Sequence, residues 1–202
     1  MRGTRVYRAL QARDGRRFAI REAEPDDAPQ LITHAQLMLV EPQWNVTELG
    51  EFHSTIDQEE SWIFSFQERP HSILLVADFG RPEQPRIGGV ISFLSQPRVR
   101  TRHRGRLGIG VQRPYRGLGV GEAMLSTLLA WATAEPELER VELSVFGHNA
   151  RAINLYHKLG FVEEARLVRA YKLSDGTYYD DVMMVKWVKS EPASALEYRR
   201  EP

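Results

Sequence analysis

Short apolar runs, several of them alternating with polar residues, recur along the chain and are typical of buried or half-buried strands. They predict strands over residues 18–21, 72–78, 87–94, 107–111 and 141–145. Two further β-rich runs, 165–173 and 178–188, flank Asp175-Gly176, a dipeptide suited to the positive φ values of a tight hairpin turn. The pattern therefore predicts a sheet that closes with a hairpin.

Between these runs the apolar residues recur with helical spacing, which indicates helices with one buried face. The pattern predicts a first helix over 25–39, a weaker second helix within 43–67, a third from 119 to 131 and a fourth ending at 159. Asn149 stands where the N-cap of the fourth helix should lie, and Gly160 follows its last apolar residue. Because the strand pattern at 107–111 is followed by helical spacing from residue 119, we expect a strand to lead into a helix near Gly119.

Composition places the chain among ordinary globular proteins, with 42% hydrophobic and 27% charged residues. Its 202 residues fit one domain, because typical domains hold about 100–200 residues. Lys and Arg balance Asp and Glu at 27 each, so no overall charge points to nucleic acid or to a membrane. No signal peptide and no apolar run of about 18 residues occurs, so we expect a cytoplasmic protein without a membrane partner.

Cysteine is absent, which excludes a disulfide framework, a thiolate nucleophile and a zinc site built on cysteine. The six histidines show no H-x-x-x-H or similar ligand spacing. Because catalytic zinc sites depend on such spacing, we predict no metal.

A glycine-rich segment, QRPYRGLGVG at 112–121, lies between a predicted strand and a predicted helix. Gly117, Gly119 and Gly121 remove Cβ atoms where the first helical turn exposes unpaired N–H groups. The helix dipole and the charges of Arg113 and Arg116 make a diphosphate a suitable ligand. The alternative is a glycine-rich turn without a ligand.

Two commoner phosphate loops do not match this segment. A Walker A loop needs Lys after its last glycine, but Gly121 is followed by Glu122. The dinucleotide-binding G-x-G-x-x-G belongs early in a βαβ unit, whereas the glycines here are spaced G-x-G-x-G and follow more than half of the chain. A nucleoside triphosphatase and a Rossmann oxidoreductase are therefore disfavoured.

The spacing R-x-x-G-x-G at 116–121 follows a strand, and N-x-x-A-x-x-L-Y-x-K-x-G-F at 149–161 follows one helix and one strand later. This order and spacing resemble the GNAT superfamily of N-acetyltransferases, and the segment GFVEEARLVRAYKLSDGTYYDDVMMVKW resembles its branch that acetylates small amines, amino acids or ribosomal-protein N-termini. The resemblance implies a single-domain α/β (α+β) fold, with a central mixed, mostly antiparallel sheet, a splayed parallel strand pair and helices on both faces. It divides the chain into an N-terminal extension (1–15), an acetyltransferase domain (16–189) and a charged tail (190–202).

The same resemblance implies acetyl-CoA as the acetyl donor, bound where two parallel strands, here 107–111 and 141–145, splay apart. The backbones of Ile109, Gly110 and Val111 would hydrogen-bond the pantetheine arm. The pyrophosphate would lie on the amides of Arg116, Gly117, Leu118, Gly119, Val120 and Gly121. Asn149 matches a position that contacts the cofactor, and Tyr156 matches the tyrosine near its sulfur.

Acetyl transfer to an amine sets clear chemical demands. A neutral amine attacks the thioester, the carbonyl oxygen gains negative charge, and the thiolate must be protonated as it leaves. Backbone N–H groups near Ile109 can stabilise the oxyanion, and Tyr156 is the predicted catalytic general acid. The alternatives are that Tyr156 is a core aromatic of its helix and that Asn149 only caps that helix, a role compatible with cofactor contact.

The general base is not apparent from the sequence. Many members of the superfamily carry Glu near the position that Arg106 occupies here. Either water relays the proton to a carboxylate elsewhere, or the amine arrives deprotonated. The candidate bases are Glu41, Glu48, Glu51, His103 and Asp181.

We expect transfer to the primary amine of a small molecule, by direct attack through a tetrahedral intermediate. Residues 41–60 hold six carboxylates and no Lys or Arg, which suits a cationic amine or is simply a solvated face. The alternatives are a protein or peptide N-terminal amine as acceptor, and a catalytically silent acetyl-CoA-binding sensor. Homodimers are common in the superfamily, so a homodimer is an expected assembly.

Five arginines alternate between residues 98 and 106: Arg98, Arg100, Arg102, Arg104 and Arg106. In a strand they would share one face. That stripe could bind the CoA 3′-phosphate, an acidic acceptor or RNA, but we favour an exposed hairpin and expect no nucleic acid partner.

Overall fold

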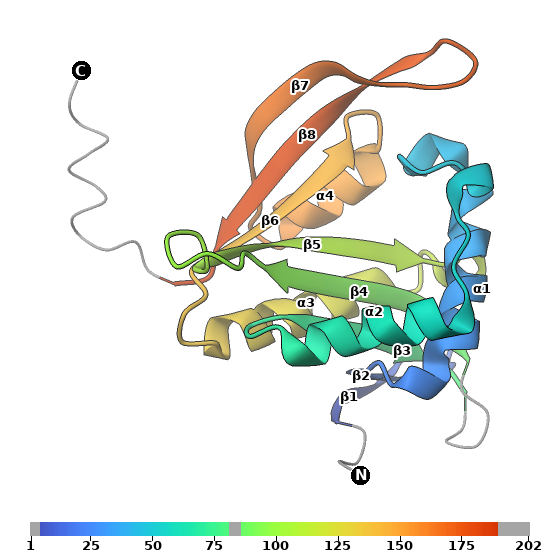
Figure 1. Cartoon of the computed structure of the whole chain (residues 1–202), viewed down its shortest axis with the longest axis vertical. Helices are drawn as coiled ribbons and strands as arrows, with labels where there is room; N and C mark the ends of the chain where they lie inside the picture. Colours follow the sequence, from blue (N-terminus) through green and yellow to red (C-terminus); the bar gives the residue numbers. More distant parts are fainter. Residues whose placement is uncertain (1–4, 81–85, 190–202) are drawn as a thin grey trace.

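In the computed structural model, which describes residues 5–80 and 86–189, one eight-stranded sheet runs through the molecule in the order β1-β2-β3-β4-β5-β6-β8-β7 (Figure 1). The strands are β1 (Val6–Gln11), β2 (Arg17–Glu22), β3 (Ile73–Asp78), β4 (Ile87–Ser95), β5 (Arg104–Val111), β6 (Arg140–Phe146), β7 (Val162–Lys172) and β8 (Tyr178–Trp187). Neighbouring strands are antiparallel except β5 and β6, which are parallel. The predicted fold class is therefore confirmed.

Helices cover both faces of this sheet, with α1 and α2 on one face and α3 and α4 on the other (Figure 1). The α-helices are α1 (Ala28–Leu39), α2 (Ile56–Glu68), α3 (Val120–Ala134) and α4 (Ala150–Lys158). Short 3-10 turns are η1 (Pro25–Asp27), η2 (Pro42–Trp44), η3 (Leu49–Glu51) and η4 (Arg113–Tyr115). The larger core packs α3 and α4 on the sheet through Leu125, Leu128 and Tyr156, and the smaller core packs α1 and α2 through Leu31 and Ile63.

β5 and β6 pair only at their beginnings, over Arg104–Arg140, Gly105–Val141 and Arg106–Glu142. Each strand stays bonded to its other neighbour beyond that point, so the two diverge and open a V in the sheet (Figure 1). The buried Glu142 holds the closed end, because it forms ion pairs with Arg104 at 3.1 Å and Arg140 at 2.7 Å. Gly105 is required there, since a Cβ would lie 2.4 Å from the Leu94 carbonyl oxygen.

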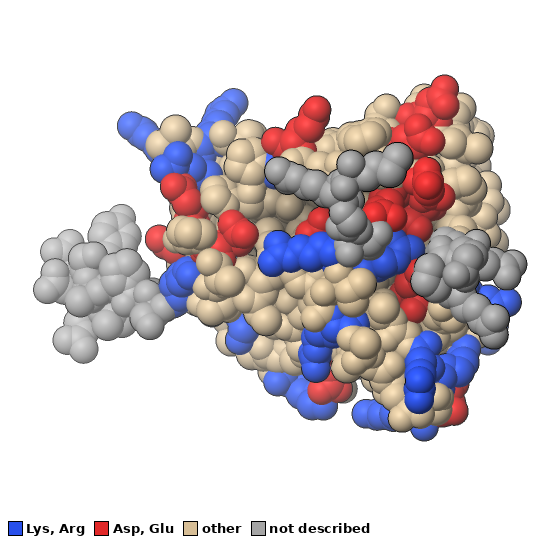
Figure 2. Space-filling view, turned by 90° about the horizontal axis from the view of Figure 1, so that it is seen from below, with Lys and Arg blue, Asp and Glu red and all other residues tan. Residues whose placement is uncertain are grey.

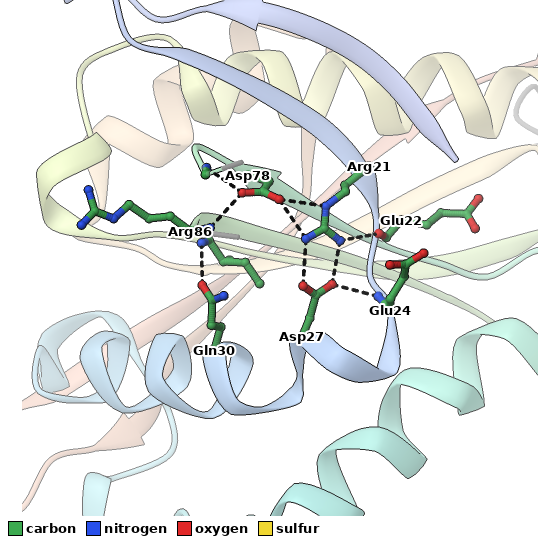
Figure 3. Close-up of polar contacts among 9 residues, drawn as sticks. Arg21, Glu22, Glu24, Asp27, Gln30, Asp78 and Arg86 are labelled. Atoms are coloured by element: carbon green, nitrogen blue, oxygen red, sulfur yellow. Dashed lines mark hydrogen bonds and ion pairs between the residues drawn. The ribbon is translucent and has the colours of Figure 1, made fainter. Parts of the chain in front are cut away.

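A buried ion cluster holds the start of the first helix against the sheet (Figure 3). The guanidinium of Arg21, on β2, donates two hydrogen bonds to Asp27 in η1, at 2.7 and 2.8 Å. It also contacts Asp78 at the end of β3, whose other oxygen accepts from the backbone N–H groups of Gly80 and Arg86. A charge this deeply buried needs such partners, so the cluster ties three separate segments together.

The predicted closing hairpin is confirmed by the antiparallel pair β7–β8, but two local details differ from the prediction. The polar lead before residue 16 contains β1, which pairs with β2 as an edge strand. Its strand signal is weak because an edge strand buries little: only Tyr7 and Leu10 are partly buried. At the closing hairpin, only Gly176 has a positive φ, of 88°, while the Asp175 side chain accepts a hydrogen bond from the Thr177 N–H. The tail at 190–202 lies outside the described residues.

The arginine stripe does not form. β5 begins only at Arg104, and residues 98–102 lie in the preceding turn. Arg102 pairs with Glu137 and Arg104 with Glu142, so these charges are locally compensated. Figure 2 likewise shows basic and acidic side chains interspersed over the face seen there. Within the described part of the chain, no helix is both long enough and apolar enough to cross a membrane.

Candidate functional site

The V between β5 and β6 opens into two adjoining hollows. A groove of about 730 Å³ runs along the glycine loop, β5 and the start of α4. A smaller hollow of about 230 Å³ lies over β6 and the β7–β8 hairpin. Trp44, Ile109, Asn149 and Tyr156 line both, so the two hollows meet where the strands diverge.

The glycine loop, residues 112–121, connects β5 to α3 and lies at one end of the groove. Gly117 and Gly119 adopt φ values of 79° and 89°, which favour glycine, and Gly119 is the N-cap of α3. The first N–H groups of the helix have no intrahelical acceptor and lie at the groove. Of the predicted loop residues, Leu118 alone does not line the groove, because its side chain packs on the core. The loop therefore offers backbone donors to an anion, as its sequence predicts.

The positive charges at this loop are not those predicted. Arg116 lines the groove, but its guanidinium is already engaged: it forms an ion pair with Glu41 at 2.6 Å and donates to the Val111 carbonyl at 2.7 Å. Arg113 does not line the groove. Arg13 and Arg151 line it as well, and Arg13 holds the loop by donating its backbone N–H to the Leu118 carbonyl at 3.1 Å. These two arginines come from distant segments, so no local pattern identified them.

The backbone of β5 forms one wall of the groove. Ile109, Gly110 and Val111 pair with β4 on one side, while past Arg106 their other side has no β6 partner. Apart from the Val111 carbonyl, which accepts from Arg116, the backbone groups on that side have no strand partner, so they face the V and can bond an extended ligand. Gly110 leaves room for His34 on α1, because a Cβ there would lie 3.1 Å from Nε2 of His34.

His34 lies buried behind this wall, with Nδ1 3.2 Å from the Gln112 amide nitrogen. Burial and the nearby Arg116 guanidinium lower the pKa of His34 to about 4. The imidazole is therefore neutral at pH 7, and it supports β5 without adding a charge to the groove.

This lowered pKa predicts a loss of stability in acid. The pKa of His34 rises from about 4 to its ordinary 6.5 on unfolding, so the unfolded chain binds more protons between these values. The contribution of His34 to the free energy of unfolding is complete above pH 6.5 and falls by about 3 kcal/mol as the pH drops to 4. Urea unfolding at pH 7, 5 and 4 should show a shallower decline for His34→Gln than for the wild type. Parallel declines would contradict the assignment.

α4 presents two predicted residues to the junction of the hollows. Asn149 caps the helix, since its Oδ1 accepts from the Ala152 N–H at 3.1 Å, which confirms the predicted cap. Tyr156 is 7% exposed, and its ring lies edge-on to Phe161. Burial raises the pKa of Tyr156 to about 12. The hydroxyl is therefore protonated at neutral pH and can donate a hydrogen bond.

Aromatic rings from three segments stack beside the V. Trp44 in η2 stacks on His148, which lies before α4, with ring centroids 5.1 Å apart. His148 also contacts Tyr179 of β8 at 3.9 Å, and its Nε2 lies 3.0 Å from the Gln43 carbonyl. The loop after α1 therefore reaches across to β6 and β8 where the two hollows meet. Trp44 and His148 come from distant segments, so no local sequence pattern predicts this contact.

The five candidate bases lie in different places. Glu41 is paired with Arg116, and Glu48 and Glu51 interact across the exposed turn η3. His103 lies at the closed end of the V, where its carbonyl accepts from Glu139 and Arg140. Asp181 lines the smaller hollow, and the other four line neither hollow. Within residues 5–80 and 86–189, no three His, Asp or Glu side chains are grouped to hold a metal ion.

Comparisons with known proteins point to one family. A family model described as "Acetyltransferase (GNAT) family" matches residues 39–161. An L-amino acid N-acetyltransferase, AaaT, of Escherichia coli strain K12 is 32% identical over 102 residues, which cover 49% of this chain and 62% of that protein. An N-alpha-acetyltransferase of Sulfurisphaera tokodaii is 29% identical over 163 residues, which cover 80% of this chain and 89% of that protein.

The chain thus spans less than two thirds of the E. coli relative, and it also spans 41% of an uncharacterized N-acetyltransferase, YokL, of Bacillus subtilis. Among solved structures, an acetyltransferase of the GNAT family from Streptococcus pneumoniae matches with a TM-score of 0.78 and 28% identity, over 85% of this chain and 99% of that one. The yncA protein of Salmonella typhimurium, a putative acetyltransferase solved with its cofactor acetyl-CoA, has a TM-score of 0.74 and 19% identity, over 87% and 96% of the two chains.

Proposed function

Because the chain belongs to the GNAT family of acetyltransferases, we propose that it transfers an acetyl group from acetyl-CoA to the primary amine of a small molecule. The observation that carries this proposal is the V between β5 and β6, which joins a groove lined by the glycine loop to a second, smaller hollow. One hollow suits the donor and the other the acceptor.

The groove has the chemistry that acetyl-CoA requires. The N–H groups of Gly117, Gly119 and the first turn of α3 would bind the pyrophosphate, with Arg13 and Arg151 supplying positive charge. The backbone groups of Ile109, Gly110 and Val111 that face the V would bond the pantetheine arm along β5, except the Val111 carbonyl, which already accepts from Arg116. That arm would bring the thioester to the junction of the hollows.

At the junction, direct transfer follows from the residues present. The amine nitrogen attacks the carbonyl carbon of the thioester, so a C–N bond forms and the C–S bond breaks. A backbone N–H near Ile109 would stabilise the oxyanion of the tetrahedral intermediate. Tyr156, which lines both hollows, would donate a proton to the leaving sulfur. The acetyl-CoA supplies an activated acyl group and a good leaving thiolate.

The size of the smaller hollow favours a small acceptor over a peptide. It holds about 230 Å³, and Trp44, which lines it, stacks on His148, which lines the adjoining groove. The S. tokodaii relative, which is named as an N-alpha-acetyltransferase, keeps a peptide N-terminus as the second candidate. A peptide acceptor would have to displace that contact.

Thermal unfolding with acetyl-CoA tests the donor assignment. Ligand at about 100 times its Kd adds about 2.7 kcal/mol, which raises the Tm of a chain of this size by roughly 5–11 °C. NAD and ATP should produce no such shift. Gly119→Glu should abolish the shift, because it strains a φ of 89° and places a carboxylate at the anion-binding amides.

Gly176→Glu is the matched control, since Gly176 has a φ of 88° and equally open space but lies in the remote hairpin turn. It should keep the full shift. A wild-type protein with no acetyl-CoA shift would refute the donor, whereas a shift without thiol release on a panel of amines would favour the silent sensor.

A further inference from the structure

The smaller hollow contains a buried carboxylate that is only half satisfied. Asp181 on β8 is 6% exposed, and its Oδ2 accepts a hydrogen bond from Ser144 Oγ at 3.0 Å. Its Oδ1 is also buried and makes no hydrogen bond of good geometry among the described residues, although the Tyr171 hydroxyl lies close enough to interact with the carboxylate. Leaving a buried charged oxygen unpaired is costly, so a cationic or donor group of a ligand is the partner this oxygen lacks.

A positive group lies on the other side of the same serine. Arg106 donates from Nη2 to Ser144 Oγ at 3.3 Å, and its side chain is otherwise exposed. Arg106 and Asp181 form no ion pair with each other, because the serine hydroxyl separates them. Opposite charges therefore lie on either side of Ser144: Asp181 lines the smaller hollow, whereas the exposed Arg106 side chain lies outside its lining and could reach a ligand that protrudes from it.

Strand register explains why these side chains meet. Arg106 pairs with Glu142, Ser144 lies two residues further along β6, and Ser144 pairs with Met183, two residues from Asp181. Side chains two residues apart share a face, so Arg106, Ser144 and Asp181 lie on one face of the sheet. Tyr156 packs against the opposite face with α4. An amine and the thioester would thus approach the V from opposite faces.

Apart from Asn149, the other side chains that line the hollow are apolar or aromatic. Val46, Leu107 and Phe146 line the hollow, together with Trp44 and Tyr171. Burial raises the pKa of Tyr171, and the charge of the nearby Asp181 and a hydrogen bond to it raise it further, while the charge of Arg106 opposes the shift. The Tyr171 hydroxyl is therefore a protonated neighbour of the carboxylate. The apolar and aromatic side chains of the hollow offer a surface that an apolar side chain of the acceptor could contact.

From this arrangement we propose that Asp181 and Arg106 form a paired-charge acceptor site for zwitterionic α-amino acids with apolar side chains. The inference rests on the proposed acetyl transfer. Asp181 binds the ammonium group and accepts its first proton, and Arg106 binds the α-carboxylate. Arg106, near whose position many members of the superfamily carry Glu, would then bind the acceptor. Asp181 of β8 would supply the base instead.

The proton balance is complete with the groups present. The ammonium gives one proton to Asp181, and the freed lone pair forms the C–N bond to the carbonyl carbon. As the C–S bond breaks, the sulfur takes the Tyr156 proton, which is replaced by the second proton leaving the nitrogen. The amide keeps one N–H, and Asp181 returns its proton to solvent.

The test compares leucine, methionine and phenylalanine with the amines formed by their decarboxylation, using the full chain and acetyl-CoA. The wild type should acetylate at least one of the amino acids with a higher kcat/KM than its amine. Asp181→Asn should lower kcat/KM for both by about 100-fold. Arg106→Gln should lower kcat/KM for the amino acid at least tenfold more than for the amine, because only the amino acid has a carboxylate to lose.

Two matched controls remove a charge nearby without touching the hollow. Asp180→Asn alters the adjacent residue of β8, whose Oδ1 accepts from the Arg169 N–H, and Arg100→Gln alters an exposed arginine of the turn before β5. Both should retain wild-type kinetics. Equal losses in Asp180→Asn and Asp181→Asn would overturn the proposal.

Calorimetry with the CoA-bound protein separates this proposal from the proposed function. The wild type should bind one of the three amino acids, and Asp181→Asn should not, while both keep the thermal shift with acetyl-CoA. Acetyl transfer to amines with an unaffected Asp181→Asn variant would refute the paired-charge site alone. A wild type that neither binds nor acetylates any of the three amino acids would also refute it, and the acetyl-CoA shift would still report on the donor.

Discussion

Replacing Tyr156 with phenylalanine is expected to lower turnover by about 10²–10⁴-fold while acetyl-CoA affinity stays unchanged. The phenol is 7% exposed and lines both hollows at their junction. Its pKa of about 12 keeps the proton in place until the thiolate develops. Phenylalanine retains the ring that packs edge-on against Phe161, so the core is preserved and only the hydroxyl is lost.

Thiol release under saturating acetyl-CoA measures the loss, and the thermal shift with acetyl-CoA confirms that the donor still binds. Tyr178→Phe is the control, because Tyr178 is 41% exposed on the hairpin, away from the junction. It should retain full turnover. Unchanged turnover in Tyr156→Phe would leave the ring as a core aromatic of α4, the alternative that its helical stripe also allows.

The parts of the site that were predictable are those made within one short segment. The glycine-rich start of α3, the cap by Asn149 and the family resemblance over 107–161 all depend on residues close in the chain, and the comparisons confirm the family. Glycine spacing encodes a backbone conformation, and a conformation of that kind is local. The site roles of Tyr156 and the loop amides remain predictions.

The errors arise where a side chain finds its partner far along the chain. Arg116 looks like a free charge beside the glycine loop, but it pairs with Glu41, 75 residues away. Arg13 comes from a segment interpreted as a polar lead, and it reaches the loop only because the β1–β2 turn packs there. Asp181 and Arg106 meet through strand register, which a single sequence does not reveal.

Local patterns can also mimic the wrong element. The alternation of arginines between 98 and 106 is that of a strand face, yet the first three lie in a turn. Charged residues tolerate turns and exposed strands equally well, so their spacing carries little information on structure. Apolar alternation is more reliable because burying the wrong face has a large cost in free energy.

Arg21→Met is expected to lower the free energy of unfolding by about 3–5 kcal/mol. Removing the guanidinium leaves the buried carboxylate of Asp27 and the partly buried carboxylate of Asp78 without their counter-ion, as the geometry in Figure 3 shows. Asp27 is 2% exposed, so water cannot replace the lost partner without opening η1 and the start of α1. The loss should therefore exceed that of any exposed ion pair in the chain.

Urea unfolding at pH 7 measures this loss, with Arg17→Ala as the control because Arg17 is exposed on the same strand. The control should stay within about 0.5 kcal/mol of the wild type. The double variant Arg21→Met, Asp27→Asn should lose less than the single variant, since it removes one of the stranded charges. A single-variant loss no larger than that of Arg17→Ala would mean that the cluster adds no net stability, and α1 would then be held by its apolar contacts alone.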